Sequence, residues 1–220
     1  MLMNTIITIG REFGSGGREI GEKLAEHFGI KCYDKELLAR AAKESGLCEE
    51  VFENHDERPT SSFLYNLVMD TYSFGYNNSA YMDMPVSHKV FLAQFDAIKN
   101  IAKDGPCVIV GRCADYALQD MPNVLNIFIY GKMESRIKRI MSRFDDITTP
   151  EKARSMITKK DKQRKSYYDY YSSRKWGHTG TYDLSVDSSV LGIEGTVNLI
   201  IQFIEDFEKT GGKKSLEGIE

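Results

Sequence analysis

Hydrophobic and polar positions along the 220-residue chain follow two patterns, one typical of strands and the other typical of helices. Short apolar or β-branched runs predict strands at residues 5–9, 30–33, 105–111, 123–131 and 182–187. Between these runs, apolar residues recur every three or four positions and predict helices at residues 18–28, 35–45, about 90–101, from 133 to 143, 150–177 and 192–209.

The alternation of strands and helices predicts a doubly wound α/β fold, with a parallel sheet and helices on both faces. The runs at 105–111 and 123–131 are apolar without alternation, which suits strands covered on both sides. We expect one domain over residues 1–210 and a flexible, glycine-rich tail at 211–220. Residues 47–85 show no clean period, and they predict either a helical insertion, at about 47–88, or a mobile flap.

Composition narrows the function classes. Hydrophobic residues make up 41% and charged residues 28% of the chain, as in an ordinary globular protein. The net charge of -3 gives no overall attraction to nucleic acid, so a site for a polyanion requires local clusters of Lys and Arg. The four cysteines form no CxxC pair, which favours reduced thiols. With no apolar run near the roughly 20 residues that a membrane helix needs, we expect a cytoplasmic protein with neither membrane nor nucleic acid as partner.

The stretch "GSGG" lies between the first predicted strand and the first predicted helix. In such a turn, backbone N–H groups and the helix dipole converge on an anion, so Gly14, Ser15, Gly16 and Gly17 are candidates for binding phosphate. The pattern GxxxxGK[ST], aligned on Gly16, places an arginine at the first glycine, Gly17 at the lysine and Arg18 at the hydroxyl residue. We predict that Arg18 supplies the charge, because a guanidinium binds phosphate in a bidentate manner. A tight turn without a ligand is the alternative.

Arginines form the other candidate features. Arg112 follows an apolar strand, where α/β sheets bind ligands, although an ordinary surface arginine is the alternative. Arg139 and Arg143 share a helix face with Arg136, and Arg164 lies in a second basic run. These charges indicate either solvated helix faces or a lid that closes on transferring phosphates. Five aromatic residues follow this basic run: Tyr167, Tyr168, Tyr170, Tyr171 and Trp176. They could stack on a base, but their helical spacing favours packing in the core or at a dimer contact.

From Ile6 to about Phe207, the chain resembles the nucleoside monophosphate kinases of the P-loop superfamily, and most closely the cytidylate kinases and the cytidylate kinase-like group. "REFGSGGR" takes the place of their usual loop. "YDKELLARAA" is similar to the stretch that contacts the acceptor nucleotide, which implies this role for Asp34 and Arg40. "VIVGRCAD" resembles their Asp-Gly-Arg-Asp stretch, with Arg112 matching the arginine for the acceptor phosphate, Val110 replacing the first aspartate and Asp115 falling later than the second aspartate.

"FIYGKMESRIKRI" and "KKDKQRKS" look like the two sides of the family's lid, at about residues 136–178, and "YDLSVDSSVLGIEGTVNLI" is similar to its closing strand and helix. This resemblance implies a P-loop NTPase-like fold with a helical lid, ATP as donor, Mg²⁺ and a small nucleotide acceptor, CMP or dCMP first. It implies catalytic roles for Arg18, Arg112, Arg139, Arg143 and Arg164, and a substrate-binding role for Asp161. A regulatory nucleotide-binding protein with weak or no turnover, a kinase for a different small acceptor, and a nucleic-acid-binding module are the alternatives.

Overall fold

The computed structural model describes residues 3–46, 50–51, 56–57 and 85–214. In this part of the chain, five parallel strands form one sheet in the order β2-β3-β1-β4-β5. The strands are β1 (Ile6–Arg11), β2 (Lys31–Tyr33), β3 (Cys107–Val110), β4 (Val124–Tyr130) and β5 (Leu184–Asp187). The predicted parallel α/β sheet is therefore confirmed, with β1 at its centre.

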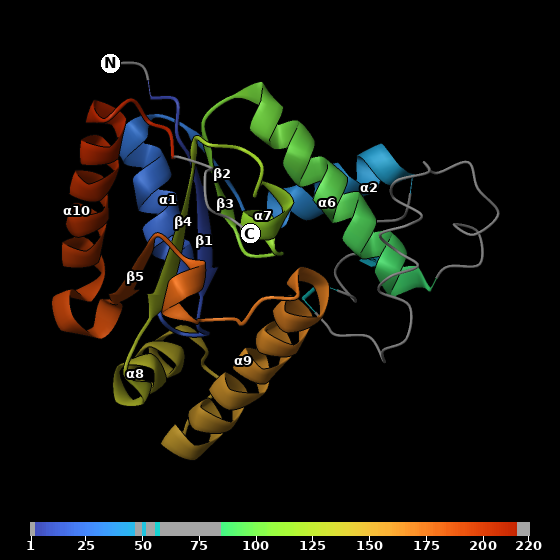
Figure 1. Ribbon diagram of the computed structural model, residues 1–220. Helices are drawn as coiled ribbons and strands as arrows, with labels where there is room; N and C mark the ends of the chain where they lie inside the picture. Colours follow the sequence, from blue (N-terminus) through green and yellow to red (C-terminus); the bar gives the residue numbers. More distant parts are fainter. Residues whose placement is uncertain (1–2, 47–49, 52–55, 58–84, 215–220) are drawn as a thin grey trace.

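Helices cover both faces of the sheet (Figure 1). On one face, α1 (Gly17–Phe28) and α10 (Ser188–Lys209) pack on Ile7 and Ile9 of β1. On the other face, α2 (Lys35–Ser45), α6 (Val86–Asp104) and the short α7 (Ala114–Ala117) pack in the cluster that contains Ile6 and Ile109. Successive strand residues point to opposite faces, so neighbours along β1 enter different clusters and the doubly wound arrangement follows.

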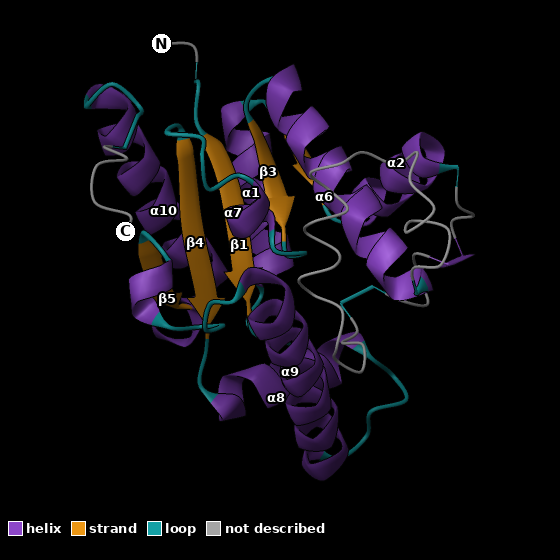
Figure 2. Ribbon diagram, turned by 45° about the vertical axis from the view of Figure 1, so that its right-hand side comes forward, coloured by secondary structure: helices purple, strands orange, loops and turns teal. Residues whose placement is uncertain are grey.

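Two further helices, α8 (Met133–Arg143) and α9 (Pro150–Ser172), form a hairpin beyond the carboxyl ends of the strands (Figure 2). A short 3-10 turn, η1 (Thr179–Thr181), precedes β5. The hairpin has a small apolar cluster of its own, made by Ile137, Ile140, Ala153 and Ile157. The hydroxyl of Thr149 caps α9 by accepting from the Lys152 N–H, and Pro150 occupies the first turn. The hairpin thus lies at the edge where α/β sheets bind ligands.

Several boundaries differ from the prediction. Helix α10 begins at Ser188, four residues before the predicted start, because the Asp187 side chain caps it and a kink at Gly192 (φ 68°) interrupts the helical pattern. Helix α9 ends at Ser172, where Ser173 adopts a left-handed conformation (φ 55°). Most of the predicted insertion at 47–88 and of the tail at 211–220 lies outside the described residues. No helix in the described part of the chain is long and apolar enough to span a bilayer.

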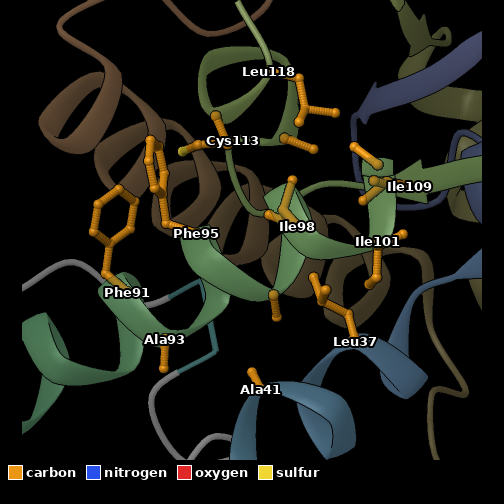
Figure 3. Close-up of a cluster of buried hydrophobic side chains, with 14 of the residues drawn as sticks. Leu37, Ala41, Phe91, Ala93, Phe95, Ile98, Ile101, Ile109, Cys113 and Leu118 are labelled. Carbon is orange, nitrogen blue, oxygen red and sulfur yellow. The ribbon is translucent and has the colours of Figure 1, made fainter. Parts of the chain in front are cut away.

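Tyrosines of α9 complete the core on the α6 side of the sheet. Tyr167, Tyr168 and Tyr171 are buried, and the ring of Tyr171 stacks on Phe91 with centroids 3.9 Å apart. Figure 3 shows the part of this cluster around α6, where the ring of Phe91 lies near that of Phe95. Core packing, rather than stacking on a base, is confirmed for these three tyrosines.

We expect Tyr171→Ala to lower the free energy of unfolding by about 3–5 kcal/mol, because it removes a fully buried ring from a packed cluster. Tyr130→Ala, at a residue that is 39% exposed, should lower the free energy of unfolding by about 1 kcal/mol or less. Urea denaturation of both variants measures the difference. Equal losses would contradict the assignment of Tyr171 to the core.

Candidate active site

The loop between β1 and α1 is shaped by its glycines. Gly14 and Gly16 have φ angles of 81° and 87°, and a Cβ atom added to Gly16 would lie 2.2 Å from Cδ1 of Ile193. Only glycine fits this turn without strain. The loop leads directly into α1, whose first-turn N–H groups and dipole favour an anion.

A cavity of about 650 Å³ lies beside this loop. It opens at the carboxyl ends of the strands, between the loop, the start of α2 and the α8–α9 hairpin, as expected for a doubly wound sheet. Its lining is rich in charged residues and glycines: Arg11, Glu12, Gly14, Gly16, Gly17, Arg18, Asp34, Lys35, Asp56, Glu57, Arg112, Arg143, Lys160 and Arg164. The arrangement is large enough for a nucleotide and offers many donors to its phosphates.

Glu57 stands at the inner end of this cavity. Its carboxylate accepts two hydrogen bonds from the Arg11 guanidinium (2.5 and 3.1 Å) and one from Nε of Arg164 (3.0 Å). The Arg112 N–H also donates to it, at 3.3 Å. Burial raises the pKa of Glu57, but the neighbouring charges of Arg11, Arg164 and Arg112 outweigh burial and lower it. Glu57 is therefore an ionised carboxylate surrounded by cationic side chains.

Arg112 binds two further carboxylates. Its Nε and Nη2 donate to the two oxygens of Asp56 (3.0 and 2.9 Å), while Nη1 donates to Asp34 (2.7 Å) and to the Val110 carbonyl (3.0 Å). Burial disfavours the guanidinium, yet Asp56 and Asp34 outweigh it and raise the pKa of Arg112. Burial raises the pKa of Asp34, but the charge of Arg112 outweighs burial, so the pKa of this carboxyl lies below its ordinary value. Arg112 thus remains charged with its planar fork fully engaged.

The hairpin contacts the loop through the arginine face of α8. Arg136 is buried, donates through Nε to the Phe13 carbonyl (2.9 Å), and forms ion pairs with Glu12 and Asp161. Asp161 accepts from the Phe13 N–H at 2.7 Å. These bonds hold the loop against both helices of the hairpin.

Arg139 and Arg143 lie further along the same face. Arg139 donates to the Gly14 carbonyl at 2.6 Å, and Arg143 pairs with Glu19 on α1. Burial first, and then the nearby charge of Arg143, lower the pKa of Arg139. The arginine face of α8 therefore points toward the loop rather than into open solvent, although the Arg143 side chain stays partly exposed.

The structure brings together most of the predicted site residues. Gly14, Gly16, Gly17, Arg18, Asp34, Arg112, Arg143 and Arg164 line the cavity. Arg18 lies at its rim, with a side chain 48% exposed and ion pairs to Glu22 (2.8 Å) and Asp34 (3.4 Å). Ser15 is fully buried instead, and its carbonyl accepts from the Ser188 hydroxyl at 2.6 Å.

Two residues singled out by the sequence lie elsewhere. Arg40 is not in the cavity lining and pairs with Glu44 (2.7 Å) and Asp104 (2.8 Å). Asp115 is buried and accepts from the Tyr168 hydroxyl, and its pKa is raised by burial. Among the described residues, no group of three or more His, Cys, Asp or Glu side chains is arranged to hold a metal ion.

Sequence reasoning missed three residues of the site. Arg11 occupies the first glycine position of the phosphate-loop pattern, so that alignment already marked its place, but it gave the arginine no role. Asp56 and Glu57 lie in a segment without hydrophobic periodicity, and in that segment no pattern distinguishes them from other acidic residues.

Comparison with known proteins assigns the chain to a family. The sequence model described as the cytidylate kinase-like family matches residues 6–190, so the chain belongs to that family. The cytidylate kinase of Pyrococcus horikoshii is 24% identical over 216 residues, which cover 96% of this chain and 96% of that protein. The cytidylate kinase of Methanocaldococcus jannaschii is 25% identical over 208 residues, covering 93% and 99%.

Solved structures define the fold. An uncharacterised protein from Eubacterium ventriosum superposes with a TM-score of 0.67 at 32% identity, covering 91% of this chain and 98% of that one. The shikimate kinase of Bacteroides thetaiotaomicron superposes with a TM-score of 0.51 at 10% identity, with the same coverage, and shows the fold alone. The fold is that of the P-loop NTPases, and the family supports a phosphotransferase of the nucleotide-kinase type.

We expect Glu57→Gln to lower the free energy of unfolding at pH 7 by about 3–5 kcal/mol, because it leaves buried guanidiniums without their counter-ion. In the folded protein, the pKa of Glu57 lies below its ordinary value of 4.5. The ionised carboxylate therefore contributes its full stabilisation above about pH 4.5, and this contribution is lost as the pH falls toward the folded-state pKa. Urea denaturation from pH 7 to pH 3 should therefore show that the difference in unfolding free energy between the wild type and Glu57→Gln becomes smaller in acid. Glu194→Gln, at an exposed carboxylate, is the control; a constant gap for Glu57→Gln would contradict the assignment.

Proposed function

We propose that the protein is an ATP-dependent phosphotransferase that phosphorylates a nucleoside monophosphate, with CMP or dCMP as the first candidates. One observation carries the proposal: the guanidiniums of Arg11 and Arg164 and the backbone N–H of Arg112 converge on the buried carboxylate of Glu57, beside a glycine-rich loop and a helix N-terminus. Phosphoryl transfer depends on positioned positive charge more than on covalent protein chemistry. A cluster that holds carboxylate oxygens in this way is suited to hold phosphate oxygens.

The donor phosphates would lie against the loop. Gly14, Ser15, Gly16 and Gly17 would present backbone N–H groups, and Arg18 would contribute charge from the rim. Mg²⁺, when bound, would neutralise the donor phosphates, and phosphate oxygens and water would supply most of its ligands. The glycine turn and the volume of the cavity fit a nucleoside triphosphate.

The acceptor phosphate would bind Arg112. Its fork already makes a bidentate contact with the Asp56 carboxylate, which a phosphate would replace oxygen for oxygen. Asp34 would keep the guanidinium oriented while the acceptor exchanges. Arg40 has no part in this proposal, since it lies outside the cavity lining.

The hairpin would act as the lid. Arg139, Arg143 and Arg164 would neutralise charge on the transferred group, and Asp161 would position the loop through Phe13. Burial and the nearby charge of Arg11 lower the pKa of Arg164 to about 10, so this guanidinium stays protonated at neutral pH. Closure around the nucleotides would exclude water from the reaction.

A nucleotide-binding protein without turnover is the second candidate, favoured by the loop residues that depart from GxxxxGK[ST]. The buried arginines around the cavity count against it, because a binding protein needs fewer charges around a transferred phosphate.

A coupled ADP-release assay tests the proposal, with ATP, Mg²⁺ and a panel of ribo- and deoxyribonucleoside monophosphates. We expect turnover with CMP or dCMP, and a decrease of about 10²–10³-fold in Arg112→Ala, because one positioned charge is lost. Arg174→Ala is the matched control: Arg174 binds Gln119 and lies over the Tyr116 ring, so activity should be unchanged. ATP binding without turnover on any acceptor would favour the binding-protein alternative.

A further inference from the structure

We propose that Arg11 supplies, from the first position of the loop, the cation that the lysine of a phosphate loop supplies from the helix. The inference rests on the proposed function, because it assigns a residue to the donor phosphates. It also explains two departures from the GxxxxGK[ST] pattern as one coordinated change: arginine in place of the first glycine, and Gly17 in place of the lysine.

The path of the Arg11 side chain explains Gly17. A Cβ atom added to Gly17 would lie 2.6 Å from Cβ and 3.1 Å from Cγ of Arg11. The backbone of β1 fixes the position of the Arg11 Cβ atom, so rotation of the side chain does not relieve the closer of these two contacts. The stem of Arg11 therefore occupies the space in which a lysine side chain at position 17 would begin.

The far end of Arg11 explains a second glycine. Gly111 follows β3 with a φ angle of 80°, and a Cβ atom added there would lie 2.1 Å from Nη1 of Arg11 and 2.7 Å from Cζ. The side chain thus runs from the start of α1 to the end of β3. Its guanidinium reaches the inner part of the cavity, where Glu57 accepts both of its hydrogen bonds.

Ion pairing and exposure distinguish the side chain of Arg11 from that of Arg18. The Arg11 side chain is 9% exposed and its guanidinium shares Glu57 with Arg164. The Arg18 side chain is 48% exposed and pairs with Glu22, four residues along the same helix. A cation shielded from water interacts more strongly with a phosphate than one at the rim does. Arg11 is therefore the inner cation of the loop, and Arg18 contributes from outside.

The test moves the positive charge from position 11 to position 17. We compare Arg11→Gly, Gly17→Lys and the double variant R11G/G17K, measuring ATP binding by calorimetry with Mg²⁺ and turnover by ADP release. Each single variant should lose about 10- to 100-fold in ATP affinity: Arg11→Gly removes the charge, and Gly17→Lys forces two side chains into one space. The double variant should regain most of the affinity and turnover, because a lysine then fills the vacated path.

Arg11→Met provides a second variant, since it keeps an unbranched stem beside Gly17 and removes only the charge. It should fold, by thermal denaturation, and lose ATP affinity to a similar extent as Arg11→Gly. Arg18→Ala should lose less than Arg11→Met, and Arg174→Ala should match the wild type.

The outcomes separate this assignment from the proposed function. Wild-type protein that does not bind ATP would overturn both. Wild-type binding that Arg11→Met leaves intact would overturn the role of Arg11 alone, as would a folded R11G/G17K variant without recovery.

Discussion

The ion pairs of Glu57 are the interaction on which the site depends. One carboxylate joins the end of β1 through Arg11, the end of β3 through the Arg112 N–H, and α9 through Arg164. Guanidiniums this close together repel one another, and little water reaches them to screen the repulsion. An ionised Glu57 lies between these side chains and offsets that repulsion, so the carboxylate stabilises the cationic cluster.

Buried ion pairs also hold the α8–α9 hairpin against the glycine-rich loop. Arg136 is buried between Glu12 and Asp161 and also binds the Phe13 carbonyl, so α8, α9 and the loop are joined by charge as well as by the small apolar cluster of the hairpin. A buried pair of this kind adds little net stability, but it sets the position of each partner. These contacts therefore place the arginines of α8 beside the glycine-rich loop.

Much of the fold could be predicted from the sequence, because strands and helices each follow their own periodicity and glycines mark the turns. The start of α10 could not, since the kink at Gly192 looks like a helix boundary. Arg112 and Arg164 were predicted as site residues, yet Arg11 and Glu57 were not: their importance comes from a contact across 46 positions of sequence, and no local pattern encodes it. Arg136 shares a face with Arg139, and periodicity does not show that it would be buried in ion pairs.

In the proposed function, donor and acceptor phosphates meet over one arginine cluster. Calorimetric titration with a bisubstrate analogue, adenosine and cytidine joined by five phosphates, tests it most directly. We predict binding at one site per chain and more tightly than ATP or CMP alone, because a single molecule engages both ends of the cavity, with that advantage lost in Arg112→Ala. Binding no tighter than ATP alone, and unchanged in Arg112→Ala, would contradict the account.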